Sequence, residues 1–227
     1  MARAAIAGVP YHVIQRGHRH EDVFFTIADR RRYLQFLQDY AQQYGLEILA
    51  YCLMINHVHL VVVPVREDSM AACMRAIGFR YAQYLNRLRR QEGRVWHGRY
   101  FSCPLENKDD YFWEAIRYVE RNPVRAGLMT SSETYEWSSE QAHCGLKEDS
   151  MLARTAELRD VVGNWSEWLK SRESDEFLVH LRRCTSTGRP LGNDDFINEL
   201  EVMSGRNMHS RPRGRPRKPA AVKAEDV

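Results

Sequence analysis

Two neighbouring runs of apolar and β-branched residues constrain the fold of this chain more than any other feature. The runs are LEILAYCLM (46–54) and HVHLVVVP (57–64), and only Ile55 and Asn56 separate them. Runs of this length and composition favour β-strands. Because a connection this short can join antiparallel strands but not parallel ones, we expect the two runs to pair as neighbours in an antiparallel sheet.

The segments on either side of these runs alternate between strand and helix patterns. Strand patterns occur at 10–16 and in VWHGRYFSCPLE, and apolar residues at helical spacing occur at 29–44, at about 68–91 and at 108–121. The resulting order is strand, helix, strand, strand, helix, strand, helix. This order predicts an α+β fold in which a ferredoxin-like (RRM-like) antiparallel sheet carries its helices on one face.

Beyond about residue 130 the pattern changes to short helical stretches and then to a basic tail. Helices are predicted at 156–162, 166–171, 175–183 and 194–203. The last two surround a turn that is long for a helix-turn-helix unit. The tail has six basic residues and no acidic one between 206 and 218. We therefore expect three parts, namely an α+β domain at 1–145, a small helical subdomain at 146–205 and a flexible tail at 206–227.

Cysteine spacing and hydropathy exclude several classes of protein. The chain has five cysteines, an odd number with no C-x-x-C pair, which indicates neither a disulfide framework nor a cysteine zinc site. No stretch approaches the roughly 20 apolar residues that a membrane span needs, and the first ten residues lack the apolar run of a signal peptide. We therefore expect a cytoplasmic protein with no membrane partner.

His57 and His59 are the first candidates for a functional site. Side chains alternate across a strand, so these two project from one face about 7 Å apart. Two imidazoles at that spacing can share one divalent cation. An isolated H-x-H motif also occurs where two histidines of a strand bind no ligand. For the motif alone, this plainer interpretation is favoured.

Tyr118 and Asn122 form a second candidate pair, near the end of the helix that stops before Pro123. Residues four apart lie on one face of a helix, so the tyrosine and amide oxygens can point to the same place. The plainer interpretation makes Tyr118 a core aromatic and Asn122 a cap for the turn that Pro123 begins. Neither pair identifies a function by itself.

Together the two pairs resemble a known family. NHVHLVVVP resembles the histidine–hydrophobic–histidine (HUH) motif of single-tyrosine transposases, and YVERNPVRAGL (118–128) resembles their tyrosine helix. PYHVIQRGHRHEDVFF and VWHGRYFSCPLE are similar to the REP-associated branch of that family, so the resemblance covers about residues 10–145. GRPLGNDDFINELE and RGRPRK resemble the C-terminal extension of the branch. GHRH at 17–20 departs from the glycine, asparagine and arginines of many relatives, which leaves the roles of His18 and His20 open.

The resemblance implies a metal-dependent endonuclease and strand transferase with its catalytic domain at 1–145. Tyr118 would be the nucleophile, and His57, His59 and Asn122 would bind Mg²⁺ or Mn²⁺. The expected substrates are single-stranded DNA hairpins of the repetitive extragenic palindrome (REP) type, cleaved through a 5′-phosphotyrosine intermediate. Such an enzyme needs an activating cation because a tyrosine with its ordinary pKa of about 10 is a poor nucleophile at pH 7.

Arginines and one further tyrosine are the candidate DNA contacts. Bases can stack on aromatic rings and phosphates can pair with arginines, although each such residue is more often solvated or packed. The candidates in the body of the chain are Arg16, Arg80, Arg87, Arg99, Tyr100 and Arg117. In the tail, RPRGRPRK resembles an AT-hook and adds Arg213, Arg215 and Arg217, although a solubilising tail is an equal alternative. The subdomain at 146–205 is also expected to bind DNA.

Three other functions compete with this prediction. A rolling-circle initiator or relaxase shares the histidine strand and the tyrosine but usually carries a further large domain. A HIT-type nucleotide hydrolase would need a third histidine where Val61 stands. A domesticated, non-catalytic DNA-binding regulator would need neither metal nor Tyr118, and it is the main alternative. We expect the protein to be associated with the nucleoid and able to exist as a monomer.

Overall fold

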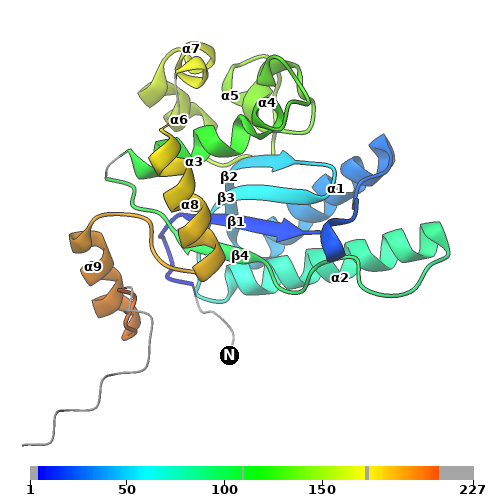
Figure 1. The fold of residues 1–227 in the computed structure, drawn as a ribbon, viewed down its shortest axis with the longest axis horizontal. Coiled ribbons are helices and arrows are strands. Elements are labelled where there is room, and N and C mark those ends of the chain that lie inside the picture. The colour runs from blue at the N-terminus through cyan, green and yellow to red at the C-terminus, as the bar shows by residue number, and fades with distance from the viewer. Residues whose placement is uncertain (1–4, 109, 172–173, 210–227) are drawn as a thin grey trace, which may run out of the picture.

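The two β-rich runs pair as expected, within an antiparallel sheet. The computed structural model describes residues 5–108, 110–171 and 174–209. β2 (Leu46–Leu53) pairs with β3 (His57–Pro64), β3 pairs with β1 (Tyr11–Arg16), and β1 pairs with β4 (Phe101–Pro104). Among the described residues the strand order is β2-β3-β1-β4 with every pair antiparallel (Figure 1). The predicted α+β fold with an antiparallel sheet is confirmed.

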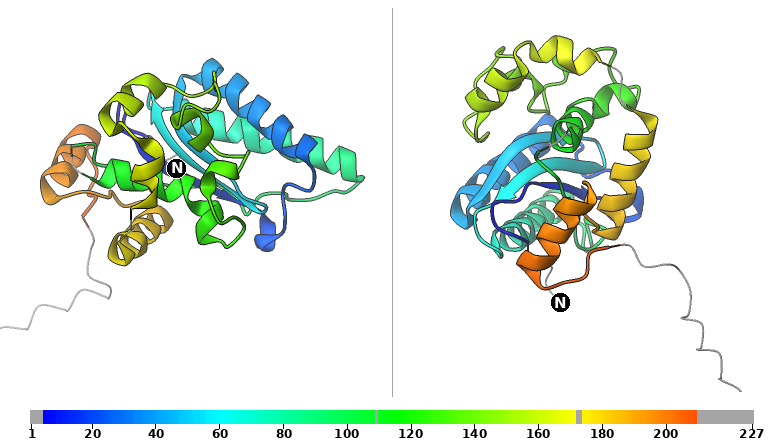
Figure 2. Two further views of the ribbon diagram at one scale, coloured as in Figure 1. Left: turned by 90° about the horizontal axis from the view of Figure 1, so that it is seen from above. Right: turned by 90° about the vertical axis from the view of Figure 1, so that its left-hand side faces the viewer.

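Helices cover both faces of the sheet, which differs from the expectation of helices on one face. α1 (Ile27–Tyr44) and α2 (Ser69–Arg89) pack on the face that presents Val58 and Leu60. α3 (Tyr111–Glu120) packs on the opposite face of the sheet (Figure 2). Val61 lies on that face. The physical reason is that β3 is apolar on both sides, and a strand of this kind must be covered on both.

Local signals fix the ends of α1. The Thr26 side chain accepts a hydrogen bond from the backbone N–H of Asp29, and the Asp29 carboxylate accepts one from the backbone N–H of Thr26. This capping box satisfies two N–H groups that the first turn leaves without a helical partner. Gly45 ends the helix with a φ of +67°, in the left-handed region where glycine is not strained.

The four helices predicted in the C-terminal part are confirmed. They are α6 (Thr155–Val162), α7 (Trp165–Lys170), α8 (Asp175–Thr187) and α9 (Asp194–Ser204). Shorter helical turns occur earlier in the chain, namely η1 (His18–His20), α4 (Asn122–Arg125), η2 (Ser132–Thr134) and α5 (Glu140–His143).

The expected boundary at residue 145 does not separate two apolar cores. Trp165, from α7, and Leu181, from α8, belong to the same buried cluster as Ile116 of α3. α8 contacts β4 and α3, while Leu191 hydrogen-bonds to the backbone of Pro104 at the end of β4. α8 is therefore part of the layer over the sheet rather than one half of a helix-turn-helix unit.

Two negative predictions concern membranes and disulfides. In the described part of the chain no helix combines the length and the apolar character that crossing a membrane requires. All five cysteines lie in that part and are free.

Candidate active site

The two candidate histidines lie side by side on β3. The ring centroids of His57 and His59 are 4.8 Å apart. His59 is 2% exposed, whereas His57, at the start of the strand, is half-buried. Arg16 stands opposite His57 in the register of β1 with β3, and its side chain is exposed. Solvent and substrate can therefore approach the pair from the His57 end.

α3 brings Tyr118 onto the same face of the sheet. The Tyr118 ring lies edge-on to His59, with the centroids 5.4 Å apart, and the side chain is 5% exposed. The guanidinium carbon of Arg125 lies 4.1 Å from the centre of the Tyr118 ring. The histidine strand and the tyrosine helix, which the sequence could only place separately, therefore meet at one point.

Asn122 lies one turn beyond Tyr118 and is 7% exposed. Its amide nitrogen donates hydrogen bonds to the backbone oxygens of Tyr118, at 2.9 Å, and Val119, at 3.4 Å. The amide nitrogen thus stabilises the end of α3, which agrees with the plainer interpretation of this residue. The amide oxygen is the atom that a cation would use, so the two interpretations are compatible.

His12 is a further member of this cluster that the sequence reasoning missed. Its ring stacks on that of His59, with centroids 5.3 Å apart, and its Nε2 lies 3.1 Å from the His59 Nδ1. The Tyr118 ring is 5.5 Å away. Alternation in PYHVIQR places His12 on the same strand face as Arg16, so the pattern contained the signal once the partner strand was known.

Burial keeps all three histidines neutral. It lowers the pKa of His57 to about 4, assisted by the charges of Arg16 and His20. It lowers the pKa of His12 to about 3, with a smaller effect of Arg125. Burial also holds the pKa of His59 well below its ordinary value. Neutral imidazole is the form that binds metal ions.

The hydrogen bonds of His57 leave one ring nitrogen for a ligand. Its Nδ1 lies 2.6 Å from the Asn56 Oδ1, and the Asn56 amide nitrogen donates to the backbone oxygen of His20. The Asn56 oxygen must therefore accept from Nδ1–H, which leaves the lone pair on the His57 Nε2. This arrangement, with the second nitrogen held by a neighbour, is typical of metal-binding histidines.

The donor set fits a divalent cation in part. Within the residues that the structure describes, no group of three or more His, Cys, Asp or Glu side chains could hold a metal ion. A site on His57 and His59 would therefore need a donor of another kind, such as the Asn122 amide oxygen. Nitrogen donors favour Mn²⁺ relative to an all-oxygen cage.

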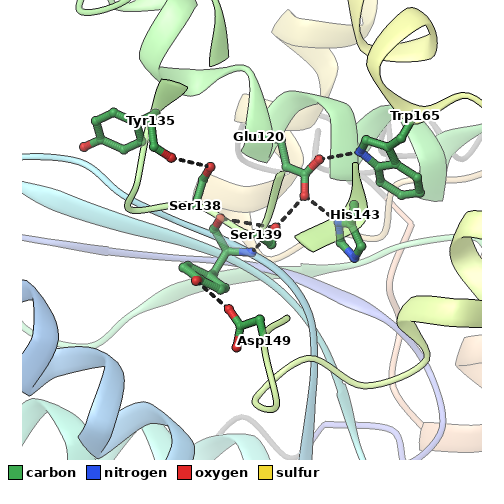
Figure 3. A network of polar contacts seen from close by, with 8 residues as sticks. Glu120, Tyr135, Ser138, Ser139, His143, Asp149 and Trp165 are labelled. Carbon is green, nitrogen blue, oxygen red and sulfur yellow. Dashed lines mark hydrogen bonds and ion pairs between the residues drawn. The ribbon is translucent and has the colours of Figure 1, made fainter. Parts of the chain in front are cut away.

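A buried carboxylate anchors the end of α3. Glu120 accepts hydrogen bonds from Ser139 Oγ at 2.5 Å, His143 Nδ1 at 2.6 Å and Trp165 Nε1 at 2.7 Å (Figure 3). Glu120 is fully buried. Since Glu120 follows Tyr118 by two residues, this network connects the tyrosine helix to α7 and to both ends of α5.

Two of the predicted DNA contacts line a hollow between α2 and the segment that leads into β4. Arg99 and Tyr100 border this hollow of about 600 Å³ together with Arg75, Phe79 and Trp96. Phe79 is 61% exposed, so the hollow combines positive charge with accessible aromatic surface. Such surfaces suit single-stranded nucleic acid.

The other predicted DNA contacts have different positions. Arg80 and Arg87 are exposed on α2, which packs on the face of the sheet opposite to His57 and Tyr118. Arg117 is only 6% exposed, pairs with Glu114 and lies over the Trp168 ring. Its guanidinium is committed to packing, so the structure does not support a DNA contact there. The tail arginines Arg213, Arg215 and Arg217 lie outside the described residues.

Comparison with known sequences points to DNA transposition. The family model described as "Transposase IS200 like" matches residues 5–122. A Haemophilus influenzae protein described as a REP-associated tyrosine transposase is 23% identical over 137 residues, which cover 51% of this chain and 77% of that protein. These similarities bear out the resemblance that the motifs predict.

Comparison with solved structures supports the fold. A REP-associated tyrosine transposase bound to a REP hairpin matches with a TM-score of 0.55 and 14% identity, over 68% of this chain and 96% of that one. A Deinococcus radiodurans protein described as a transposase is 24% identical, with a TM-score of 0.36, over 47% of this chain and 86% of that one. The first match shows a shared fold.

Proposed function

This chain belongs to the IS200-like transposase family, and on that premise we propose that it cleaves and joins single-stranded DNA through Tyr118. A divalent cation, Mg²⁺ or Mn²⁺, would be held by His57, His59 and Asn122. When bound, the cation would polarise a non-bridging oxygen of the scissile phosphate. The observation that carries the proposal is the contact between the Tyr118 ring and His59, because it brings the tyrosine helix and the histidine strand together at one point.

The reaction follows from what Tyr118 can do at that position. Its phenol oxygen would attack phosphorus, forming an O–P bond as the bond from phosphorus to the 3′-oxygen breaks. The phenol proton ends on the departing 3′-OH, and the 5′-phosphate stays on the tyrosine. Attack by another 3′-OH reverses these changes and joins a new strand. Arg125, beside the Tyr118 ring, would place positive charge near the phosphate.

The proposed substrates are hairpin-forming single strands of the REP type. The support is the resemblance of the motifs and the fold shared with a transposase bound to a REP hairpin. Arg16, exposed opposite His57, is suited to a phosphate near the cleaved bond. The hollow beside Arg99 and Tyr100 would take unpaired bases.

The test compares two tyrosines of the same helix. Wild type, Tyr118→Phe and Tyr111→Phe are incubated with end-labelled hairpin and Mg²⁺ or Mn²⁺, and adducts that survive denaturation are measured. Tyr111 is a matched control because its ring faces Phe177 at the start of α3, 6.5 Å between centroids. We expect Tyr118→Phe to abolish the adduct and Tyr111→Phe to retain it.

Two results would contradict the proposal. An adduct that persists in Tyr118→Phe but disappears in Tyr111→Phe would reassign the nucleophile. No adduct from the wild type with either metal, while the hairpin still binds, would favour the non-catalytic regulator.

A further inference from the structure

A chain of hydrogen bonds runs from α8 to His59. The Thr185 hydroxyl oxygen lies 2.8 Å from the backbone oxygen of Leu181 and 2.8 Å from the His12 Nδ1. The His12 Nε2 lies 3.1 Å from the His59 Nδ1. Thr185, His12 and His59 are each at most 2% exposed, so water does not compete for these bonds.

The chemistry of the groups sets the direction of each bond. The Leu181 carbonyl can only accept, so the Thr185 hydroxyl donates to it. The Thr185 oxygen then accepts from His12 Nδ1–H. A neutral His12 with its proton on Nδ1 has a lone pair on Nε2, which accepts from His59 Nδ1–H. The Cys103 thiol, 3.2 Å from the Thr185 oxygen, can donate to its remaining lone pair.

We propose that Thr185 and His12 are positioning residues that hold His59 in the tautomer whose Nε2 can bind the metal ion. The inference rests on the proposed metal site. Asn56 does the same for His57, so both histidines present Nε2 although their partners come from different parts of the chain. Partners of this kind fix both ring orientation and tautomer in metal sites.

The proposal gives α8 a role in the active site. Thr185 lies outside residues 5–122, the part of the chain that the family model matches. Arg182, on the same helix, has its guanidinium carbon 5.9 Å from the Tyr118 ring. The C-terminal part would therefore complete the chemistry of the site in addition to any contact with DNA.

The experiment uses the full chain and one isosteric substitution with two controls. Thr185→Val removes the hydroxyl and keeps the volume, while Thr185→Ser retains a hydroxyl. Thr187→Val is the control for this change. The Thr187 hydroxyl donates to the carbonyl of Arg183, four residues earlier, just as Thr185 donates to Leu181, but Thr187 lies on the exposed side of α8. Histidine tautomers are read from long-range ¹H–¹⁵N spectra of metal-free protein, and Mn²⁺ affinity from electron paramagnetic resonance titration.

We expect the wild-type His59 proton on Nδ1. In Thr185→Val we expect a mixed His59 tautomer and a Kd for Mn²⁺ raised about tenfold. Thr185→Ser should recover both properties and Thr187→Val should change neither. A wild-type His59 with its proton on Nε2 would overturn the proposal without any variant, as would a Thr185→Val protein with wild-type tautomer and affinity.

A separate result would identify a failure of the proposed metal site. If the wild type and a His57→Ala variant bind Mn²⁺ equally weakly, His57 and His59 do not hold the cation. The hydrogen bonds from Thr185 through His12 to His59 would then have no role in a metal site. The tautomer spectra would still show whether Thr185 orients His59.

Discussion

Replacing Glu120 would show how strongly the tyrosine helix depends on one buried carboxylate. Its three hydrogen-bond donors are Ser139, His143 and Trp165, each at most 2% exposed. Glu120→Ala would leave all three donors in a cavity. Because each unsatisfied buried donor costs about 1–3 kcal/mol, and such costs are not additive, we expect a loss of about 3–5 kcal/mol of unfolding free energy.

Glu120→Gln should cost much less. Its amide oxygen can accept from Trp165 Nε1–H, which can only donate. Its amide nitrogen would then face Ser139 and His143. The Ser139 oxygen can accept when its hydroxyl hydrogen turns away, and the His143 Nδ1 can accept when its proton moves to Nε2. The remaining cost is the extra strength that the negative charge of Glu120 gives to these hydrogen bonds. We expect this loss to be about 1–2 kcal/mol.

The assay is urea unfolding of the two variants and of Glu157→Ala, an exposed glutamate on α6. The control should change the unfolding free energy by no more than about 0.5 kcal/mol. The expected order of destabilisation is Glu120→Ala, then Glu120→Gln, then Glu157→Ala. An effect of Glu120→Ala as small as that of the control would refute this account of the network.

Three further predictions concern the metal, pH and the tail. Chelator should stop hairpin cleavage and added Mg²⁺ or Mn²⁺ should restore it; undiminished cleavage by a His57→Ala, His59→Ala double variant would exclude the site. The pKa of His12, about 3 in the folded protein, lies below its ordinary value, so the unfolded chain binds more protons and metal-free stability should fall as pH drops below about 6.5. Between pH 7 and 5, His12→Gln should lose about 2 kcal/mol less than wild type in urea unfolding, and equal losses would contradict this. Deleting 206–227 should weaken hairpin binding and flatten its salt dependence, because fewer counterions are released; equal affinities at several salt concentrations would make the tail a solubility element.

The sequence by itself determined the strands and helices of the α+β domain and the two candidate pairs of site residues. Strand and helix periods are local, so the hairpin at 46–64 and the helix before Pro123 could be read from neighbouring residues. Alternation on one strand also placed His57 and His59 on a single face, and helical spacing placed Tyr118 one turn before Asn122. Each of these predictions concerns residues within a few positions of one another.

Tertiary structure alone decided which faces meet. The sequence did not show that α3 covers the histidine face of the sheet, or that Arg117 is buried over Trp168. It also could not reveal that His12 and Thr185, 173 positions apart, share a hydrogen bond. The physical reason is that such contacts depend on how whole elements pack to bury apolar surface, and no local period encodes that arrangement.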